Sequence, residues 1–136
     1  MIEAHFTVYY RRATQLAGAM KRCQDELPAY ASAAALLAVH SAISYSDALL
    51  IELGNSRPRG ERHQAAVNAL KRACAGAKVD QKGIKHLQKL LSAKTDISYG
   101  EKSVADERIT ALCIAADRFQ TWAERTLKKR VGRQLS

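Results

Sequence analysis

Apolar residues recur at alternating spacings of three and four along most of the chain, which is the period of an amphipathic helix. Four such stripes cover about residues 2–27, 61–75, 80 to 93 or a little beyond, and 103–130. Two prolines and seven glycines provide little turn chemistry, while alanine, the best helix former, is abundant. The pattern therefore predicts an all-α fold.

The segment from Pro28 to about Leu53 is the most apolar of the expected helices. Pro28 can occupy its first turn, and Gly54 and Asn55 are typical of a left-handed C-terminal cap. Its apolar residues fall on two sides, with Leu36, Val39, Ile43, Leu50 and Leu53 on one and Ala38, Ala42, Tyr45 and Leu49 on the other. A helix that is apolar on two sides must contact two layers. We expect these layers to be the chain's own core and a second subunit, in a homodimer.

The connections between the expected helices are short. The stretch Lys94–Lys102 is polar, and Ser103 with Asp106 forms a loose variant of the capping box before the last helix. We predict one domain over residues 1–136, an up-and-down helical bundle of about five helices, with a basic C-terminal tail at 128–136. The alternative is an extended pair of long helices exchanged between subunits.

The charge of the chain favours an acidic partner. Twenty-two Lys and Arg against 13 Asp and Glu give +9 and a pI near 9.7, which suits RNA, DNA, an anionic membrane or an acidic protein. Solvated helix faces explain basic residues equally well. The basic residues gather in three places: Arg11, Arg12, Lys21 and Arg22; Arg57, Arg59 and Arg62; and Arg125, Lys128, Lys129, Arg130 and Arg133. The second group is the nucleic-acid candidate in the loop before the third helix.

Several classes of function lack support in the sequence. No window reaches 18 uninterrupted apolar residues and no secretory segment is evident, so we expect a cytoplasmic protein without membrane contact. The three cysteines form no C-x-x-C pair and fall on apolar helix positions, which indicates core packing. The histidines lie apart without ligand spacing, and phosphate-binding and hydrolase motifs are missing. We expect neither a metal site nor a cofactor.

One candidate binding site is a polar cleft. His40, Ser44 and Asp47 fall at i, i+4 and i+7, hence on one face of an otherwise apolar helix. A bundle can bring that face near a second group of candidate residues, Lys94, Asp96 and Tyr99. The cleft would bind a phosphate or nucleotide; alternatively, the same residues form a hydrogen-bonded cluster, for example from the Tyr99 hydroxyl to Asp47, that fixes helix register.

The order of features resembles a known superfamily. The features that carry the resemblance are, in order, the apolar helix AYASAAALLAVHSAISYSDALLIELG, a short basic turn, the segments GERHQAAVNAL and HLQKLLSAKTDISYGEKSV, and a closing helix with AADRFQTWAERTL. Over about residues 30–127 the chain is similar to the HEPN superfamily (higher eukaryotes and prokaryotes nucleotide-binding). This resemblance implies a helical bundle and a homodimer. It also implies association with a nucleotidyltransferase-type partner, or a place in a toxin–antitoxin or defence system, where many members are metal-independent ribonucleases.

The family's catalytic signature is an arginine followed, after four to six residues, by a histidine. The corresponding stretch here has Lys94 and Tyr99, with four residues between them. Lysine can still bind phosphate as a point charge, but tyrosine, whose unperturbed pKa is about 10, is a poor general base at neutral pH. Arg57 and His63 have the literal spacing but straddle a loop and a helix start.

We therefore expect a HEPN-like binding or partner module without catalytic residues, for which a nucleotide or RNA is a possible ligand. One alternative is a divergent ribonuclease that uses Lys94 with His40 or His63 as the acid–base group. Another is a basic RNA-binding or scaffold protein that uses only its charged surface.

Overall fold

The computed structural model describes residues 2–54, 63–99 and 105–131. Within these ranges the chain forms five α-helices and no strand: α1 (Ile2–Gln24), α2 (Ala31–Glu52), α3 (His63–Gly76), α4 (Ile84–Tyr99) and α5 (Asp106–Val131). The predicted all-α helical bundle is confirmed.

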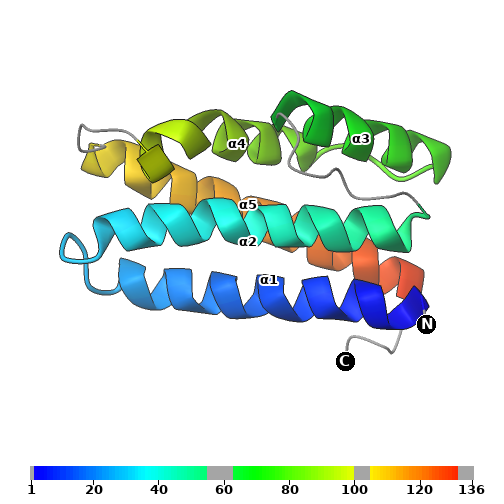
Figure 1. The fold of residues 1–136 in the computed structure, drawn as a ribbon, viewed down its shortest axis with the longest axis horizontal. Helices are drawn as coiled ribbons and strands as arrows, with labels where there is room; N and C mark the ends of the chain where they lie inside the picture. The colour runs from blue at the N-terminus through cyan, green and yellow to red at the C-terminus, as the bar shows by residue number, and fades with distance from the viewer. Residues whose placement is uncertain (1, 55–62, 100–104, 132–136) are drawn as a thin grey trace.

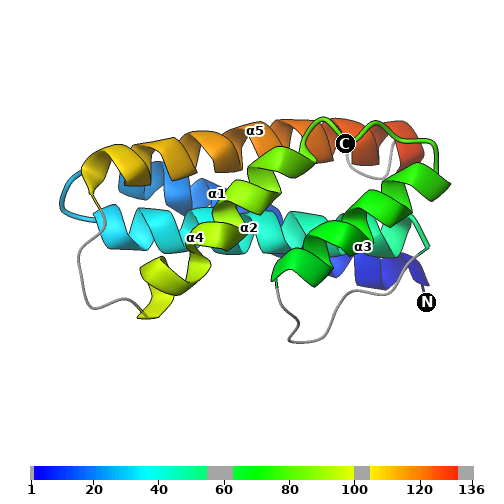
Figure 2. The same cartoon turned by 90° about the horizontal axis from the view of Figure 1, so that it is seen from above.

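Helix α2 is the centre of the bundle and contacts each of the other four helices. In Figure 1, α1, α2 and α5 run roughly along the long axis of the molecule, and α1 lies antiparallel to α2. Figure 2 shows that α3 and α4 form a hairpin that crosses α2 obliquely. Helix α1 therefore covers one side of α2, α3 and α4 cover the opposite side, and α5 packs against both α2 and α4.

The interior of α2 explains its composition. Its buried residues include Ala34, Ala35, Ala38, Ala42 and Ala48, whose small side chains allow neighbouring helices to approach closely. By length and composition alone α2 could cross a membrane, but 72% of its most apolar window is buried inside the bundle. Packing within one chain thus accounts for most of its apolar surface, while Leu36 stays exposed and Ile43 is half-buried. The homodimer remains a prediction.

Two helix ends carry left-handed residues. Gly54, with φ 83°, follows α2, as the sequence predicts, while Asn55 lies outside the described residues. After α3 the amide of Val79 donates to the Cys74 carbonyl at 2.8 Å and the amide of Lys78 donates to the Ala75 carbonyl at 3.2 Å. This is a Schellman motif with Lys78, at φ 58°, in the position that glycine usually occupies.

Some helix boundaries differ from the expected ones. Helix α2 begins at Ala31 rather than Pro28, because residues 25–30 form turns that satisfy their own backbone groups, including a bond from the Ala31 amide to the Pro28 carbonyl at 3.2 Å. Helix α4 continues to Tyr99, into the stretch expected to be a connection, because Ala93 and Ile97 extend its apolar stripe onto the core. Ser103 of the expected capping box lies outside the described residues.

Candidate functional site

The bundle brings two of the residues predicted for the polar cleft together. His40 on α2 is exposed, and its pKa is lowered first by partial burial and then by the positive charge of Lys94 on α4. The two side chains are therefore within electrostatic range of each other. Helices α2 and α4 pack against each other, and a binding site at this place stays a prediction.

The structure describes the side chains of three other cleft candidates, and each is buried or paired elsewhere. Ser44 and Asp47 are buried, with 5% and 9% of their surface exposed. The carboxylate of Asp96 instead pairs with the guanidinium of Arg108 on α5, at 3.2 Å and in an exposed position. The Tyr99 side chain lies outside the described part of the structure, as do Arg57, Arg59, Arg62 and the side chain of His63. Among the described candidates on different helices, His40 and Lys94 are the pair within electrostatic range of each other.

A stronger concentration of charge lies where the α3–α4 turn and the start of α4 meet the C-terminal half of α5. One hollow of about 310 Å³ is lined by side chains that include Lys82, Lys85, His86, Arg118 and Arg125. A second hollow of about 160 Å³ is lined by Lys78, Arg125, Lys129 and Arg130 together with Val79, Asp80 and Thr126. Arg125 lines both, so the two hollows are neighbours. We call them together the basic groove; their Lys and Arg residues are all exposed.

The pKa of His86 indicates that basic side chains of α4 and α5 lie near each other in the basic groove. The pKa of His86 is lowered first by burial and then by Lys85, Arg118 and Lys89, which belong to both helices. Asp80 is the one carboxylate among the described residues that line the two hollows. The groove therefore has a positive potential that favours an anionic ligand.

Asp80 is already engaged by hydrogen bonds. Its Oδ1 atom accepts the indole N–H of Trp122 at 2.9 Å and the backbone N–H of Lys82 at 3.0 Å. These two bonds, the Lys82 amide first, lower the pKa of the carboxyl group, so it stays charged at neutral pH. These hydrogen bonds attach the α3–α4 turn to α5, so Lys78 and Lys82 lie in the same groove as Arg125.

The floor of the groove is apolar and closed. The backbone of Gly83 lies against the Trp122 ring so closely that a Cβ atom at Gly83 would be 2.3 Å from Trp122 Cδ2. Only 3% of Trp122 is exposed, and the ring packs on Phe119 with centroids 5.6 Å apart. The groove thus offers charged walls above a floor whose aromatic faces are covered.

Most of the basic groove was missed by reasoning from the sequence, which singled out only the basic residues near the C-terminus. A signal was present: Lys78, Lys82, Lys85 and Lys89 follow one another at spacings of four, three and four, the period of one helix face. The turn at Asp80 interrupts the helical pattern, so the sequence does not predict that the four lysines lie on one helix. Arg118 becomes part of the groove only when α5 packs beside α4.

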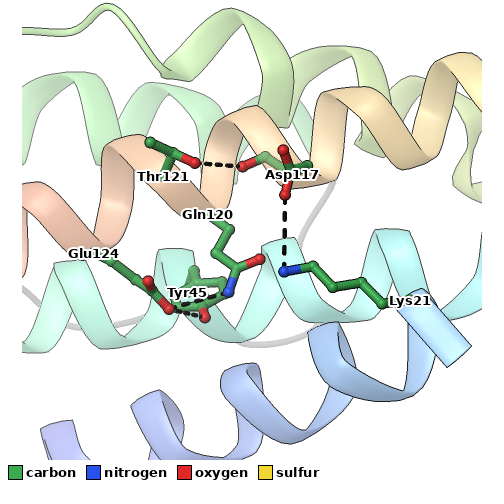
Figure 3. Close-up of polar contacts among 6 residues, drawn as sticks. All are labelled: Lys21, Tyr45, Asp117, Gln120, Thr121 and Glu124. Carbon is green, nitrogen blue, oxygen red and sulfur yellow. Dashed lines mark hydrogen bonds and ion pairs between the residues drawn. The ribbon is translucent and has the colours of Figure 1, made fainter.

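A second polar cluster lies in the interior and joins α2 to α5 (Figure 3). The hydroxyl of the fully buried Tyr45 donates to Glu124 Oε2 at 2.5 Å, and Gln120 donates to the same oxygen at 3.1 Å. Burial, followed by the hydrogen bond to Glu124, raises the pKa of Tyr45 far above its usual value. Tyr45 therefore stays protonated and acts as a structural tie between the helices rather than as an acid or base.

The cysteines offer no reactive site in the described part. Cys74 and Cys113 are buried free thiols, and burial raises the pKa of each to about 11, so both stay protonated. Their predicted place in the core is confirmed, while Cys23 is half-buried. Among the described residues no group of three or more His, Cys, Asp or Glu side chains is placed to hold a metal ion.

The fold and this site define an all-α bundle with an anion-attracting groove. No model of a known protein family matches the chain. No curated protein matches it significantly.

Proposed function

We propose that this protein is a nucleic-acid-binding module that holds a phosphate backbone in the basic groove. The observation that carries the proposal is the convergence of seven exposed Lys and Arg side chains, from the α3–α4 turn, α4 and α5, around one hydrogen-bonded carboxylate. Bringing like charges together costs energy in the free protein. A polyanion removes that repulsion and releases its own counterions when it binds.

Two other anionic partners fit the groove less well. The exposed large apolar residues of the described chain are Val8, Leu27, Tyr30, Leu36 and Ile114, and none of them lines the groove. A surface that binds a membrane inserts apolar side chains beside its basic ones, and a protein interface has an apolar centre. The absence of such side chains from the described groove lining favours a ligand recognised by charge alone.

In this proposal the protein is a HEPN-like module, as the resemblance implies, that departs from the family by lacking its catalytic pair. Lys94 and Tyr99 stand where the family has arginine and histidine. A toxin–antitoxin-like setting, a nucleotidyltransferase-type partner, homodimer formation and a cytoplasmic location belong to the same proposal. An adjacent nucleotidyltransferase gene would support this setting.

Fluorescence anisotropy with labelled RNA and DNA at low salt tests the binding. The double variant Arg118→Glu, Arg125→Glu reverses two charges in the groove and should weaken binding by at least ~10-fold. The matched control, Arg11→Glu with Arg12→Glu, makes the same change in net charge on α1 and should weaken binding much less. Equal losses in the two variants would show that net charge, and not the groove, determines affinity.

A divergent ribonuclease is a second candidate, because Lys94 lies within electrostatic range of His40 and a histidine whose pKa is lowered is neutral at physiological pH. Neutral imidazole can accept a proton while Lys94 binds phosphate. The test is metal-free RNA cleavage by the purified protein and by Lys94→Ala and His40→Ala variants. We expect no cleavage above that of the variants; cleavage that both substitutions abolish would establish the enzyme.

A further inference from the structure

The cations of the basic groove stand in two rows on neighbouring elements. One row runs from Lys78 through Lys82 to Lys85, and the other follows α5 at Arg118, Arg125 and Lys129. The spacings of seven and four on α5 place these three side chains on one face. At 1.5 Å per residue, that row extends over about 16 Å.

The described groove lining has little surface on which a base can stack. The ring of Trp122 is covered by the backbone of Gly83, and the other ring of the lining, His86, is half-buried. Phe119 beneath Trp122 is fully buried. Proteins that bind single strands combine charge with exposed aromatic faces that hold unpaired bases. A single strand in this groove would therefore gain mainly from its phosphates.

The density of phosphates separates the two forms of nucleic acid. A duplex carries one charge per about 1.7 Å of axis, because each of its two strands contributes one per about 3.4 Å. Along the 16 Å row, a duplex thus carries about ten phosphates, about five of them on each strand. One row lies on the α3–α4 turn and the start of α4, and the other lies on α5, so the cations approach the groove from two neighbouring elements. Each row can therefore contact a different strand of a duplex.

From these observations, and resting on the proposed function, we infer that the basic groove binds double-stranded nucleic acid through its backbone, without reading base sequence. The shared ligand chemistry is two antiparallel phosphate chains on either side of a duplex groove. Duplex RNA and duplex DNA both provide it. Base edges are not contacted, since the groove floor is closed by Trp122 and Gly83.

The experiment measures anisotropy of the full chain with duplex RNA and duplex DNA of about 16 base pairs, and with their component single strands, over a range of salt. We expect at least one duplex to bind ~10-fold more tightly than either of its strands. The slope of log affinity against log salt should be about −4 to −6 for that duplex and no steeper than about −3 for the strands. The duplex that binds more tightly shows whether the ligand is double-stranded RNA or double-stranded DNA.

Three outcomes overturn the inference. Equal or tighter binding of the single strands would refute it while leaving nucleic-acid binding intact. A strong preference for one duplex sequence over another of the same length would show that bases are read. If no nucleic acid binds at low salt, the proposed function fails and the inference fails with it. The double variant Arg118→Glu, Arg125→Glu should make the duplex slope shallower by about 2, with circular dichroism confirming that it folds.

Discussion

Replacing Lys78 with glycine should stabilise the fold and weaken ligand binding at the same time. Lys78 has φ 58° at the end of α3 and also lines the basic groove. The left-handed conformation costs an L-residue about 1–2 kcal/mol. Glycine avoids this cost but loses about 0.5–1 kcal/mol more backbone entropy on folding. The expected net gain is ~0.5–1 kcal/mol, which raises the melting temperature of a chain of this size by about 2–4 °C.

Lys78→Ala is the matched control, because it removes the same charge but keeps a Cβ atom in the left-handed conformation. Thermal unfolding followed by far-ultraviolet circular dichroism compares stability, and anisotropy with labelled nucleic acid compares affinity. We expect Lys78→Gly to melt above Lys78→Ala, and both to bind more weakly than the wild type by a similar few-fold factor. If the glycine variant is no more stable than the alanine variant, the argument from backbone conformation is refuted. Unchanged affinity in both variants would remove Lys78 from the binding surface.

Three further predictions concern the interior and the assembly. Tyr45→Phe should cost about 1–3 kcal/mol at neutral pH, because Glu124 loses a buried donor. Because the pKa of Tyr45 is raised in the folded state, this residue contributes to the free energy of unfolding below pH ~10, and the contribution is lost as the pH rises further. Urea unfolding should therefore show a smaller loss of stability at alkaline pH for Tyr45→Phe than for the wild type. Gly83→Ala should destabilise the fold by about 1–3 kcal/mol and shift the fluorescence of Trp122, the single tryptophan; unchanged unfolding and emission would contradict the close packing. Light scattering should give twice the chain mass of 15.0 kDa if the predicted homodimer forms, whereas a monomer at tens of micromolar would refute it.

The helices were predictable because their signals are local. The three-four spacing of apolar residues and the rarity of proline and glycine are sufficient for the class of fold, and Gly54 marks the end of α2. The end of α4 was less predictable. Residues 94–99 are mainly polar, and among their described side chains Ile97 packs against the core, so tertiary contact extends the helix beyond its strongly periodic part.

The candidate site was less predictable, because it depends on which helix covers which face. The spacing of His40, Ser44 and Asp47 places them on one side of α2, but it does not reveal that α2 is enclosed by four helices and that Ser44 and Asp47 become buried. Likewise, nothing local pairs Asp96 with Arg108 across α4 and α5. The basic groove combines segments that lie about forty residues apart, as the Asp80 to Trp122 bond does.

The central position of α2 has a consequence for synthesis of the chain. Tyr45 on α2 finds its partner, Glu124, only after α5 has left the ribosome, because the two residues are 79 positions apart. Until then one side of an apolar helix, long enough to cross a membrane, lacks its cover from α5. Incomplete chains should therefore be the species most prone to aggregation or to capture by chaperones. A ribosome-bound chain arrested before α5 should be more sensitive to protease within α2 than one that includes it.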